Sequence, residues 1–232
     1  MLRVVLAPNP SPMTLQGTQT YIVGRQRAVI IDPGPALHQH LDAVTTALGD
    51  GVAAAILLTH AHADHAEGAP ALAARLHAPV LSGQQGLTDH QRIETDAGPL
   101  VALHSPGHTA DHFSFWWPDQ HAIFCGDLMM GGLDTALVAP PEGELGAYLA
   151  SLERLATLRP TIIYPAHGPA IEDASAALQR YVQHRLQREE QVLAGLADRP
   201  GTVEDLTRHV YGAQLDPGLE PYARAAIDAY LE

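Results

Sequence analysis

The chain has 232 residues, of which 46% are hydrophobic, and this suits one folded core with a small appendage rather than a disordered chain. It holds a single cysteine, Cys125, and no lysine, which excludes an internal disulfide, a cysteine-thiolate zinc cluster and a Schiff-base lysine. The formal net charge of −13 disfavours non-specific binding of nucleic acids, although a local group of arginines could override it.

Signals for export or membrane insertion are not found in the sequence. Residues 1–12, MLRVVLAPNPSP, lack the apolar segment and the small-residue cleavage site of a secretory leader. No apolar run approaches the roughly 20 residues that a transmembrane helix needs. We therefore expect a cytoplasmic protein that does not bind membranes.

The first half of the chain alternates between strand and helix patterns. Residues 2–7, 18–23 and 28–31 are predicted strands, and the third ends in the turn signal Asp32-Pro33-Gly34. Helical spacing follows over 36–48 and 70–77, and further strands are predicted over 52–58 and 79–82. The run 52–58 is continuously apolar, which is typical of a strand buried on both faces.

The second half repeats this order loosely. Strands are predicted over 100–104, 113–117, 122–124 and 161–164. A helix is predicted over 144–158, where leucines recur at positions 145, 149, 152 and 155. Since the two halves look alike and strands dominate both, we expect two sheets packed together and flanked by helices.

The last part of the chain has a different, helical character. Residues 174–197 form one long helical pattern, and Thr202-Val-Glu-Asp205 resembles a capping box in front of a second, short helix. Residues 221–231 predict a third helix. We therefore predict a main domain over 1–172 and a small helical C-terminal unit over 173–232.

Residues 60–65 read His-Ala-His-Ala-Asp-His, directly after the predicted buried strand. Residues two apart in an extended segment point the same way, so His60 and His62 can share one metal ion. Asp64 and His65, after the chain turns, can serve a neighbouring ion. Such a dense cluster is costly to bury unless a cation neutralises it. The alternative is a polar loop exposed to solvent.

Four more candidate residues follow predicted strands, each beside Gly or Pro: Asp32, His108, Asp127 and His167. In a layered fold such strand ends converge on one edge of the core. Each residue alone could serve only in a turn, but together with residues 60–65 they fit a single site.

In this order the residues resemble the five sequence blocks of the metallo-beta-lactamase superfamily. The blocks are Asp32, the run His60 to His65, His108, Asp127 and His167, and they cover roughly residues 1–170. The resemblance implies an α/β fold, the αββα sandwich, with 1–172 as the catalytic domain. It also implies a two-metal site along one edge of the paired sheets.

The resemblance implies a role for each of these side chains. One metal would be held by His60, His62 and His108. The second would be held by Asp64, His65 and His167, and both would be bridged by Asp127. Asp32 would lie behind the ligands and orient a ligand histidine or the loop.

Imidazole and carboxylate ligands suit Zn²⁺, and also Fe or Mn, so we expect two zinc ions. Two metals about 3.5–4 Å apart lower the pKa of a bridging water to near neutrality and polarise the substrate oxygen. Asp64 would contact this nucleophile and take its proton, which makes it the predicted catalytic residue.

Other candidates are weaker. His112 could approach the site or stabilise a leaving group, although a packed histidine is the simpler interpretation. Tyr164 and Cys125 are expected to pack in the core, since a reactive thiol needs exposure and positive neighbours. Met129-Met130-Gly131-Gly132 could line a substrate pocket or belong to the core.

The superfamily contains several groups, and two features separate this chain from true β-lactamases. Those enzymes are exported, and at the position of Asp127 they typically carry Cys or Ser. A bridging Asp resembles the hydrolases of thioesters, lactones and phosphodiesters instead.

GTQTYIVG at 17–24 and YVQHRLQREEQVLAGL at 181–196 resemble the β-lactamase-like endoribonuclease group. Its members carry a small winged-helix-like C-terminal unit, and fungal relatives include acyl-carrier thioesterases. The chain departs from the group at Gln19, where Asn is usual, and in the missing pattern of a wing hairpin. Glutathione thioesterases hold their substrate with basic residues near the C-terminus, but Arg180, Arg185 and Arg188 do not align clearly with these.

We therefore predict a dinuclear metal-dependent hydrolase, in which a metal-bridging hydroxide attacks an ester, thioester or phosphodiester. A small ester or thioester fits the acidic charge best, and single-stranded RNA is the rival substrate of an endoribonuclease. The alternative is a non-catalytic, metal-stabilised binding protein, but structural zinc sites usually are mononuclear with Cys ligands. The tail helices could mediate a dimer, or pack against the main domain.

Overall fold

The computed structural model describes residues 1–198, 201–212, 215 and 218–231. Two five-stranded sheets form its centre. The first sheet has the order β1-β2-β3-β4-β5, with the bounds Leu2–Leu6, Gln19–Val23, Arg27–Ile31, Val52–Leu57 and Val80–Leu81. The second has the order β10-β9-β8-β7-β6, with the bounds Ile162–Pro165, Ala122–Gly126, Phe113–Trp117, Leu100–His104 and Arg92–Ile93.

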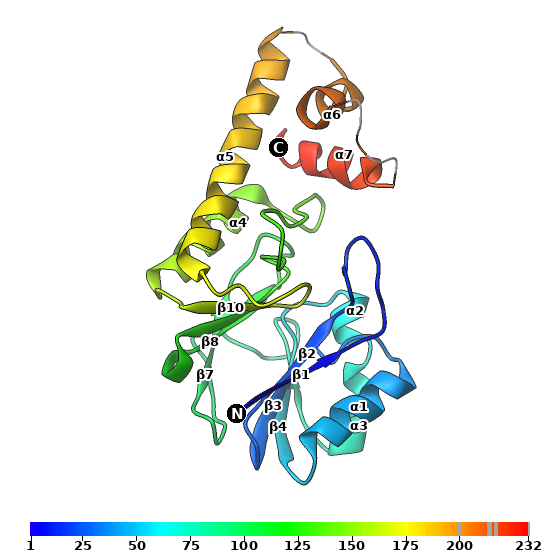
Figure 1. The fold of residues 1–232 in the computed structure, drawn as a ribbon, viewed down its shortest axis with the longest axis vertical. Helices are drawn as coiled ribbons and strands as arrows, with labels where there is room; N and C mark the ends of the chain where they lie inside the picture. The colour runs from blue at the N-terminus through cyan, green and yellow to red at the C-terminus, as the bar shows by residue number, and fades with distance from the viewer. Residues whose placement is uncertain (199–200, 213–214, 216–217, 232) are drawn as a thin grey trace.

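Helices cover the outer faces of both sheets (Figure 1). The first sheet carries α1 (His38–Leu48) and α3 (Ala69–Leu76), with the one-turn α2 (Ala63–Ala66) between β4 and α3. The second sheet carries α4 (Leu145–Thr157) and the beginning of α5 (Ala174–Asp198). A short 3-10 turn, Pro118–Gln120, joins β8 to β9.

The strand β3 shows why these residues form a buried, two-faced sheet. Ala28 and Ile30 pack outward against the helices, whereas Val29 and Ile31 pack inward against the second sheet. Burying each of these larger side chains contributes about 1.5–3 kcal/mol to folding. Apolar side chains are therefore needed at every position, which produces the continuous apolar runs seen in the sequence. The expected αββα arrangement of two sheets between helices is confirmed.

The pairing directions decide where the candidate residues lie. β3 pairs with β4 in parallel, and β9 pairs with β10 in parallel. Carboxyl ends of parallel neighbours meet at the same edge of a sheet. The residues that follow these strands are therefore brought together, two strands from each sheet.

The C-terminal unit is built on α5, which continues beyond the main body (Figure 1). The helices α6 (Val203–Tyr211) and α7 (Glu220–Asp228) pack on its distal half through Val192, Leu206 and Ile227. The predicted capping box is confirmed, because Thr202 and Asp205 each bond the backbone of the other. The predicted boundary at 172/173 stays a prediction, and residues 199–200, 213–214, 216–217 and 232 of this unit lie outside the described residues.

Two local expectations differ from the structure. Asp64 and His65 were expected after a turn of the chain, with no helix predicted there, but they lie on α2, whose single turn is closed by bonds from the His65 and Ala66 amides to the His62 carbonyl. The edge strand β6 was not predicted, because two residues are too short to show a pattern. Among the described helices, none has the length and apolar character needed to cross a membrane.

Candidate metal centre

The predicted site residues follow strands at one edge of the sandwich. Asp32 follows β3, and His60 begins the loop after β4. On the second sheet, Asp127 follows β9, His167 follows β10, and His108 lies between β7 and β8. The structure brings all of the predicted ligands into two adjoining groups, as the following distances show.

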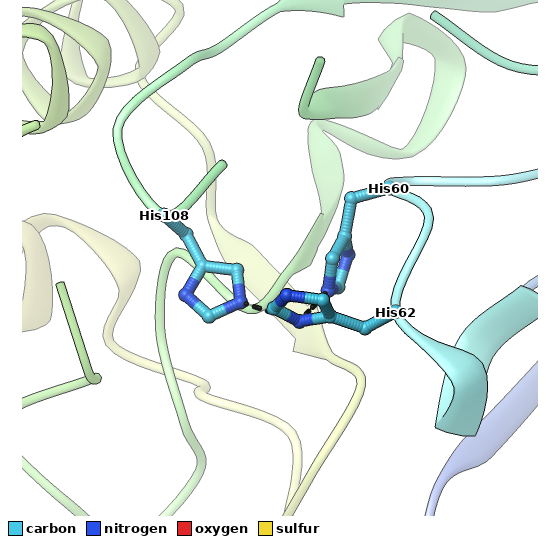
Figure 2. A group of neighbouring side chains, drawn as sticks. All are labelled: His60, His62 and His108. Atoms are coloured by element: carbon cyan, nitrogen blue, oxygen red, sulfur yellow. Dashed lines mark hydrogen bonds between the residues drawn. The ribbon is translucent and has the colours of Figure 1, made fainter. Parts of the chain in front are cut away.

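The first group consists of three histidines whose inner nitrogens face one another (Figure 2). His62 Nδ1 lies 2.9 Å from His60 Nε2 and 3.2 Å from His108 Nε2. These three atoms all lie within 4.8 Å of one another. His60 and His62 come from the loop after β4, and His108 approaches from the other sheet.

Hydrogen bonds on the outer nitrogens fix the proton position of each ring. His62 Nε2 donates to Glu142 Oε2 at 2.7 Å, and His108 Nδ1 donates to the Leu137 carbonyl at 2.8 Å. The Thr59 hydroxyl donates to Asp32, so it accepts from His60 Nδ1 at 3.0 Å. With the outer nitrogen donating, a ring in its neutral form directs a lone pair inward. Three converging lone pairs repel one another unless a cation lies among them, so this donor set fits a metal ion.

The second group consists of Asp64, His65 and His167. Asp64 Oδ2 lies 3.5 Å from His65 Nε2 and 3.3 Å from His167 Nε2. The outer nitrogens are again occupied, since His65 Nδ1 donates to Asp32 Oδ2 at 3.0 Å and His167 Nδ1 to the Gly17 carbonyl at 3.2 Å. The inner Nε2 atoms of both histidines are buried and have no hydrogen-bond partner among the described residues.

Asp127 lies between the two groups. Its Oδ1 is 3.4 Å from His65 Nε2 and 3.3 Å from His167 Nε2, whereas its Oδ2 is 3.7 Å from His108 Nε2. Oδ1 is buried and makes no hydrogen bond within the described part of the chain. One carboxylate that turns an oxygen toward each group is the geometry required for bridging two ions.

Asp32 supports both groups from behind. It is 2% exposed, and its carboxylate accepts from the Thr59 amide and hydroxyl at 2.8 Å each and from His65. Its backbone is left-handed, with φ of 49°, and its carbonyl is held by the Thr20 hydroxyl at 2.7 Å. His40 in turn bonds Thr20 at 2.9 Å. Asp32 therefore contacts one candidate ligand, His65, and the Thr59 backbone and side chain beside another.

The charges around the site suit cations. Burial lowers the pKa of His60 well below its usual value. Burial would raise the pKa of Asp127, but the neighbouring His65 and His167 hold it well below its usual range. Burial lowers the pKa of His167, yet the carboxylates of Asp127 and Asp64 raise it to about 9. Binding of a cation must therefore displace a proton from this side of the site.

His112 and the other weaker candidates are packed in the interior. His112 is buried; its Nδ1 bonds the Ser105 hydroxyl at 3.1 Å and its Nε2 accepts from the Asp127 amide at 3.4 Å. It therefore touches the backbone of a candidate ligand. Tyr164 stacks on Phe124 with ring centroids 5.2 Å apart. Cys125, Met129 and Met130 belong to the core cluster beneath α4 and α5.

Sequence reasoning missed Thr59 and Glu142. Thr59 stands beside the histidine run and carried a signal only by its position. Glu142 lies 80 residues from His62 and no local pattern connects them. The tail arginines hold other groups: Arg180 pairs with Asp134 at 2.9 Å, and Arg188 donates to the Val210 carbonyl at 2.9 Å.

A depression of about 320 Å³ opens beside His62. Its lining includes Gln84, Thr109, Asp111, Pro141 and Glu142. Among the described residues its lining contains two carboxylates and no arginine.

Comparisons with known proteins agree with this geometry. The profile of the metallo-beta-lactamase superfamily matches residues 13–96 and 81–167. The lactamase-like protein adaB of Aspergillus niger is 37% identical over an alignment of 205 positions, gaps included, which spans 83% of this chain and 62% of that protein. This chain thus spans less than two thirds of that relative's length.

Two further proteins are similar over different extents. The atrochrysone carboxyl ACP thioesterase of Aspergillus chevalieri is 35% identical over an alignment of 248 positions, gaps included, which spans 96% of this chain and 78% of that protein. The solved structure of TTHA1623 in a di-iron-bound form has 27% identity and a TM-score of 0.63 over 75% of this chain and 96% of that one.

Proposed function

The chain belongs to the metallo-beta-lactamase superfamily, and from this premise we propose that it is a dinuclear metal-dependent hydrolase. His60, His62 and His108 would hold one metal ion, Asp64, His65 and His167 the other, and Asp127 both. The observation that carries the proposal is the position of Asp127, whose two oxygens face different ligand groups. A closed structural site for one ion would not need such a carboxylate.

When bound, two such ions supply Lewis-acid activation of water and of the substrate carbonyl. The chain supplies the proton acceptor. The Asp64 side chain is 32% exposed, whereas that of His65 is fully buried, so Asp64 meets solvent at the edge of the site. Burial would raise the pKa of Asp64, but His167 and His65 lower it, so its carboxylate is ionised at neutral pH. We assign Asp64 as the group that takes a proton from the attacking water.

The metal is proposed to be zinc, with iron and manganese as the other ions that this donor set accommodates. Imidazole and carboxylate alone do not distinguish among them. The di-iron form of the similar TTHA1623 supports iron as a real alternative. Metal analysis of the purified protein separates these cases, and about two ions per chain are expected.

The substrate is proposed to be a small ester or thioester. The relative from A. chevalieri is named a carboxyl ACP thioesterase, and the depression beside His62 carries the carboxylates of Asp111 and Glu142. These charges and the net charge of −13 oppose a polyanion such as single-stranded RNA. An acyl group carried on a partner protein is included in this proposed class of thioester substrates.

Hydrolysis of a panel of acyl thioesters, lactones, bis-p-nitrophenyl phosphate and short RNA, each with and without chelator, tests the proposal. We expect chelator-sensitive thioester or ester cleavage that His62→Ala reduces by at least about 100-fold. His209→Ala, which changes an exposed histidine of α6, serves as the control. Full activity of His62→Ala would refute the assignment of His62, and cleavage of RNA alone would favour an endoribonuclease.

A further inference from the structure

The segment that follows Asp127 supports two of the proposed metal ligands. It begins at Asp127 itself, and ten residues on the Leu137 carbonyl accepts the hydrogen bond from His108 Nδ1 at 2.8 Å. A shift of this segment, residues 127–138, would therefore move the bridging carboxylate and rotate the ring of His108. Whatever fixes the segment also fixes the metal centre.

Tyr181 of α5 fastens the middle of the segment. Its hydroxyl accepts from the Met130 amide at 2.8 Å and donates to the Met130 carbonyl at 2.9 Å. The side chain is 1% exposed, so solvent cannot replace these bonds. One hydroxyl thus satisfies both backbone groups of a residue three positions from Asp127.

Arg185, one turn further along α5, fastens the far end. Its Nη2 donates to the Ala136 carbonyl, the neighbour of the carbonyl that holds His108. Its guanidinium carbon lies 5.1 Å from the centroid of the Tyr148 ring. The Tyr148 hydroxyl in turn donates to the Leu128 carbonyl at 2.6 Å. Arg185 therefore contacts the end of the segment and the tyrosine that holds its beginning.

Because Arg185 is buried, a contribution to stability alone does not explain why a cation occupies this position. The residue is 3% exposed, and among the described residues no carboxylate forms an ion pair with it. Its Nε atom also has no hydrogen-bond partner there. A buried cation without an anionic partner is costly, and an apolar side chain would fill the same space at a lower cost.

We propose that Tyr181 and Arg185 are positioning residues of the metal centre, through which the C-terminal helix α5 holds Asp127 and His108 in place. This inference rests on the proposed function, because it requires that these two residues bind metal. The C-terminal unit then helps to position the proposed metal ligands. Figure 1 shows the first half of α5 lying along the main body and its second half along α6 and α7.

Arg188 offers a matched control on the same helix. It also donates to a backbone carbonyl, that of Val210 at 2.9 Å, and its guanidinium carbon lies 4.5 Å from the centroid of the Tyr211 ring. Both of these partners belong to the C-terminal unit. Arg185 also interacts with Tyr230 of the tail. Both arginines thus contact the tail, but only Arg185 also holds the segment beside the metal centre.

The experiment compares Arg185→Met with Arg188→Met in the full chain. Zinc affinity is measured by competition with a chromophoric chelator, and ligand geometry by the visible absorption of the Co²⁺-loaded protein. We expect Arg185→Met to bind zinc roughly tenfold more weakly and to change the Co²⁺ spectrum, as for losses of outer-shell partners in other metal sites. Arg188→Met should match the wild type in both measurements, and Arg185→Lys should restore part of the affinity.

Wild-type zinc affinity and an unchanged spectrum in Arg185→Met would overturn the inference, as would an equal loss in Arg188→Met. If Arg185→Met does not fold, Tyr181→Phe replaces it, because it removes only the hydroxyl; an unchanged zinc affinity there overturns the inference as well. A wild-type protein that binds no metal would refute the proposed function itself. A wild type that binds metal alongside unaffected variants would refute only this inference.

Discussion

The outer nitrogen of each candidate ligand histidine is held by a different group. Buried side chains or backbone carbonyls hold His60, His65, His108 and His167. Only His62 depends on an exposed partner, Glu142, whose side chain is 65% exposed. A surface substitution can therefore remove the hydrogen bond that holds the His62 ring without disturbing the core.

Glu142→Ala should lower metal affinity roughly tenfold, because the imidazole of His62 loses the carboxylate that fixes its tautomer. Stability of the folded chain should change by less than about 0.5 kcal/mol, since the substituted side chain is exposed. Zinc competition and urea unfolding measure the two effects. Glu153→Ala, an exposed glutamate on α4, should change neither. An unchanged zinc affinity in Glu142→Ala would show that the hydrogen bond to His62 has no role in binding.

Asp32→Asn should damage both folding and one metal position. The Asp32 carboxylate accepts three hydrogen bonds, and an amide group in either orientation would turn its NH₂ toward a donor. We expect a loss of about 1–3 kcal/mol in the free energy of unfolding. We also expect the metal content to fall from about two ions to one, since His65 loses its orienting partner. Urea unfolding and metal analysis test this, with the exposed Asp42→Asn as control.

At the residue scale, the sequence predicts the candidate metal ligands better than the residues that hydrogen-bond to them. His60, His62, Asp64 and His65 stand out because they are crowded into one run, and the others because each follows a predicted strand. Glu142 reaches His62 only through the path of the chain between β9 and α4, which has no periodic pattern to interpret. Contacts of this kind depend on tertiary geometry and leave no local signal.

Among the elements, the parallel strand ends β3, β4, β9 and β10 determine where the chemistry can lie. All four strands were predicted from the short apolar runs in the sequence. Their arrangement in two sheets was implied by the family resemblance. The order of strands in a sheet cannot be predicted from the local hydrophobic pattern. The single turn of α2 could not be predicted, since four residues are shorter than the helical repeat pattern that sequence analysis detects.

The turn at the end of β9 requires glycine. Gly126 has φ of +53°, and a Cβ atom there would lie 2.6 Å from His112 Nε2 and 2.7 Å from Thr59 Cβ. Gly126→Ala should therefore reduce the free energy of unfolding by about 2–4 kcal/mol and displace the adjacent Asp127. Urea unfolding and zinc titration measure both.

Gly49→Ala separates backbone strain from crowding. Gly49 also has positive φ, +67°, but a Cβ there would meet no atom within 4 Å. Its loss should stay near 1 kcal/mol, with unchanged zinc affinity. Equal losses in the two variants would show that the contacts with His112 and Thr59 do not constrain this turn.

For the molecule as a whole, buried phenols predict loss of stability in alkali. Burial raises the pKa of Tyr148 to about 12, despite the opposing charge of Arg185, and raises those of Tyr21 and Tyr181 as well. Their contribution to stability is complete below the unfolded pKa of about 10 and is lost as pH rises through the folded values. Each unit of difference corresponds to about 1.4 kcal/mol.

Urea unfolding between pH 8 and 11, followed together with absorbance at 295 nm, should show these phenols ionising with unfolding. Tyr148→Phe should make the free energy of unfolding less dependent on pH in this range. Tyr222→Phe, which alters a side chain 39% exposed, should leave the dependence unchanged. Independent titration of all tyrosines near pH 10 in the folded protein would contradict the expected burial effect.

The repeated strand and helix order and the family resemblance predicted part of the arrangement of the whole molecule. The two similar halves predicted two sheets, and the long pattern over 174–197 predicted α5. The contacts of Tyr181 and Arg185 were not predicted, because one helix stripe serves equally for packing on a sheet, on α6 and α7, or on another molecule. Arginine is usually exposed, so a sequence gives no reason to expect a buried one. Its burial is seen only in the structure.

The candidate ligands are divided between the halves of the chain. His60, His62, Asp64 and His65 come from the side of the first sheet, and His108, Asp127 and His167 from the side of the second. Neither half holds a complete coordination shell, so ions bound here would cross-link the halves, and removing them would leave the two β layers joined at this edge by side-chain and backbone contacts alone. Two separately expressed fragments divided between these layers would be expected to reassociate more tightly when zinc is added.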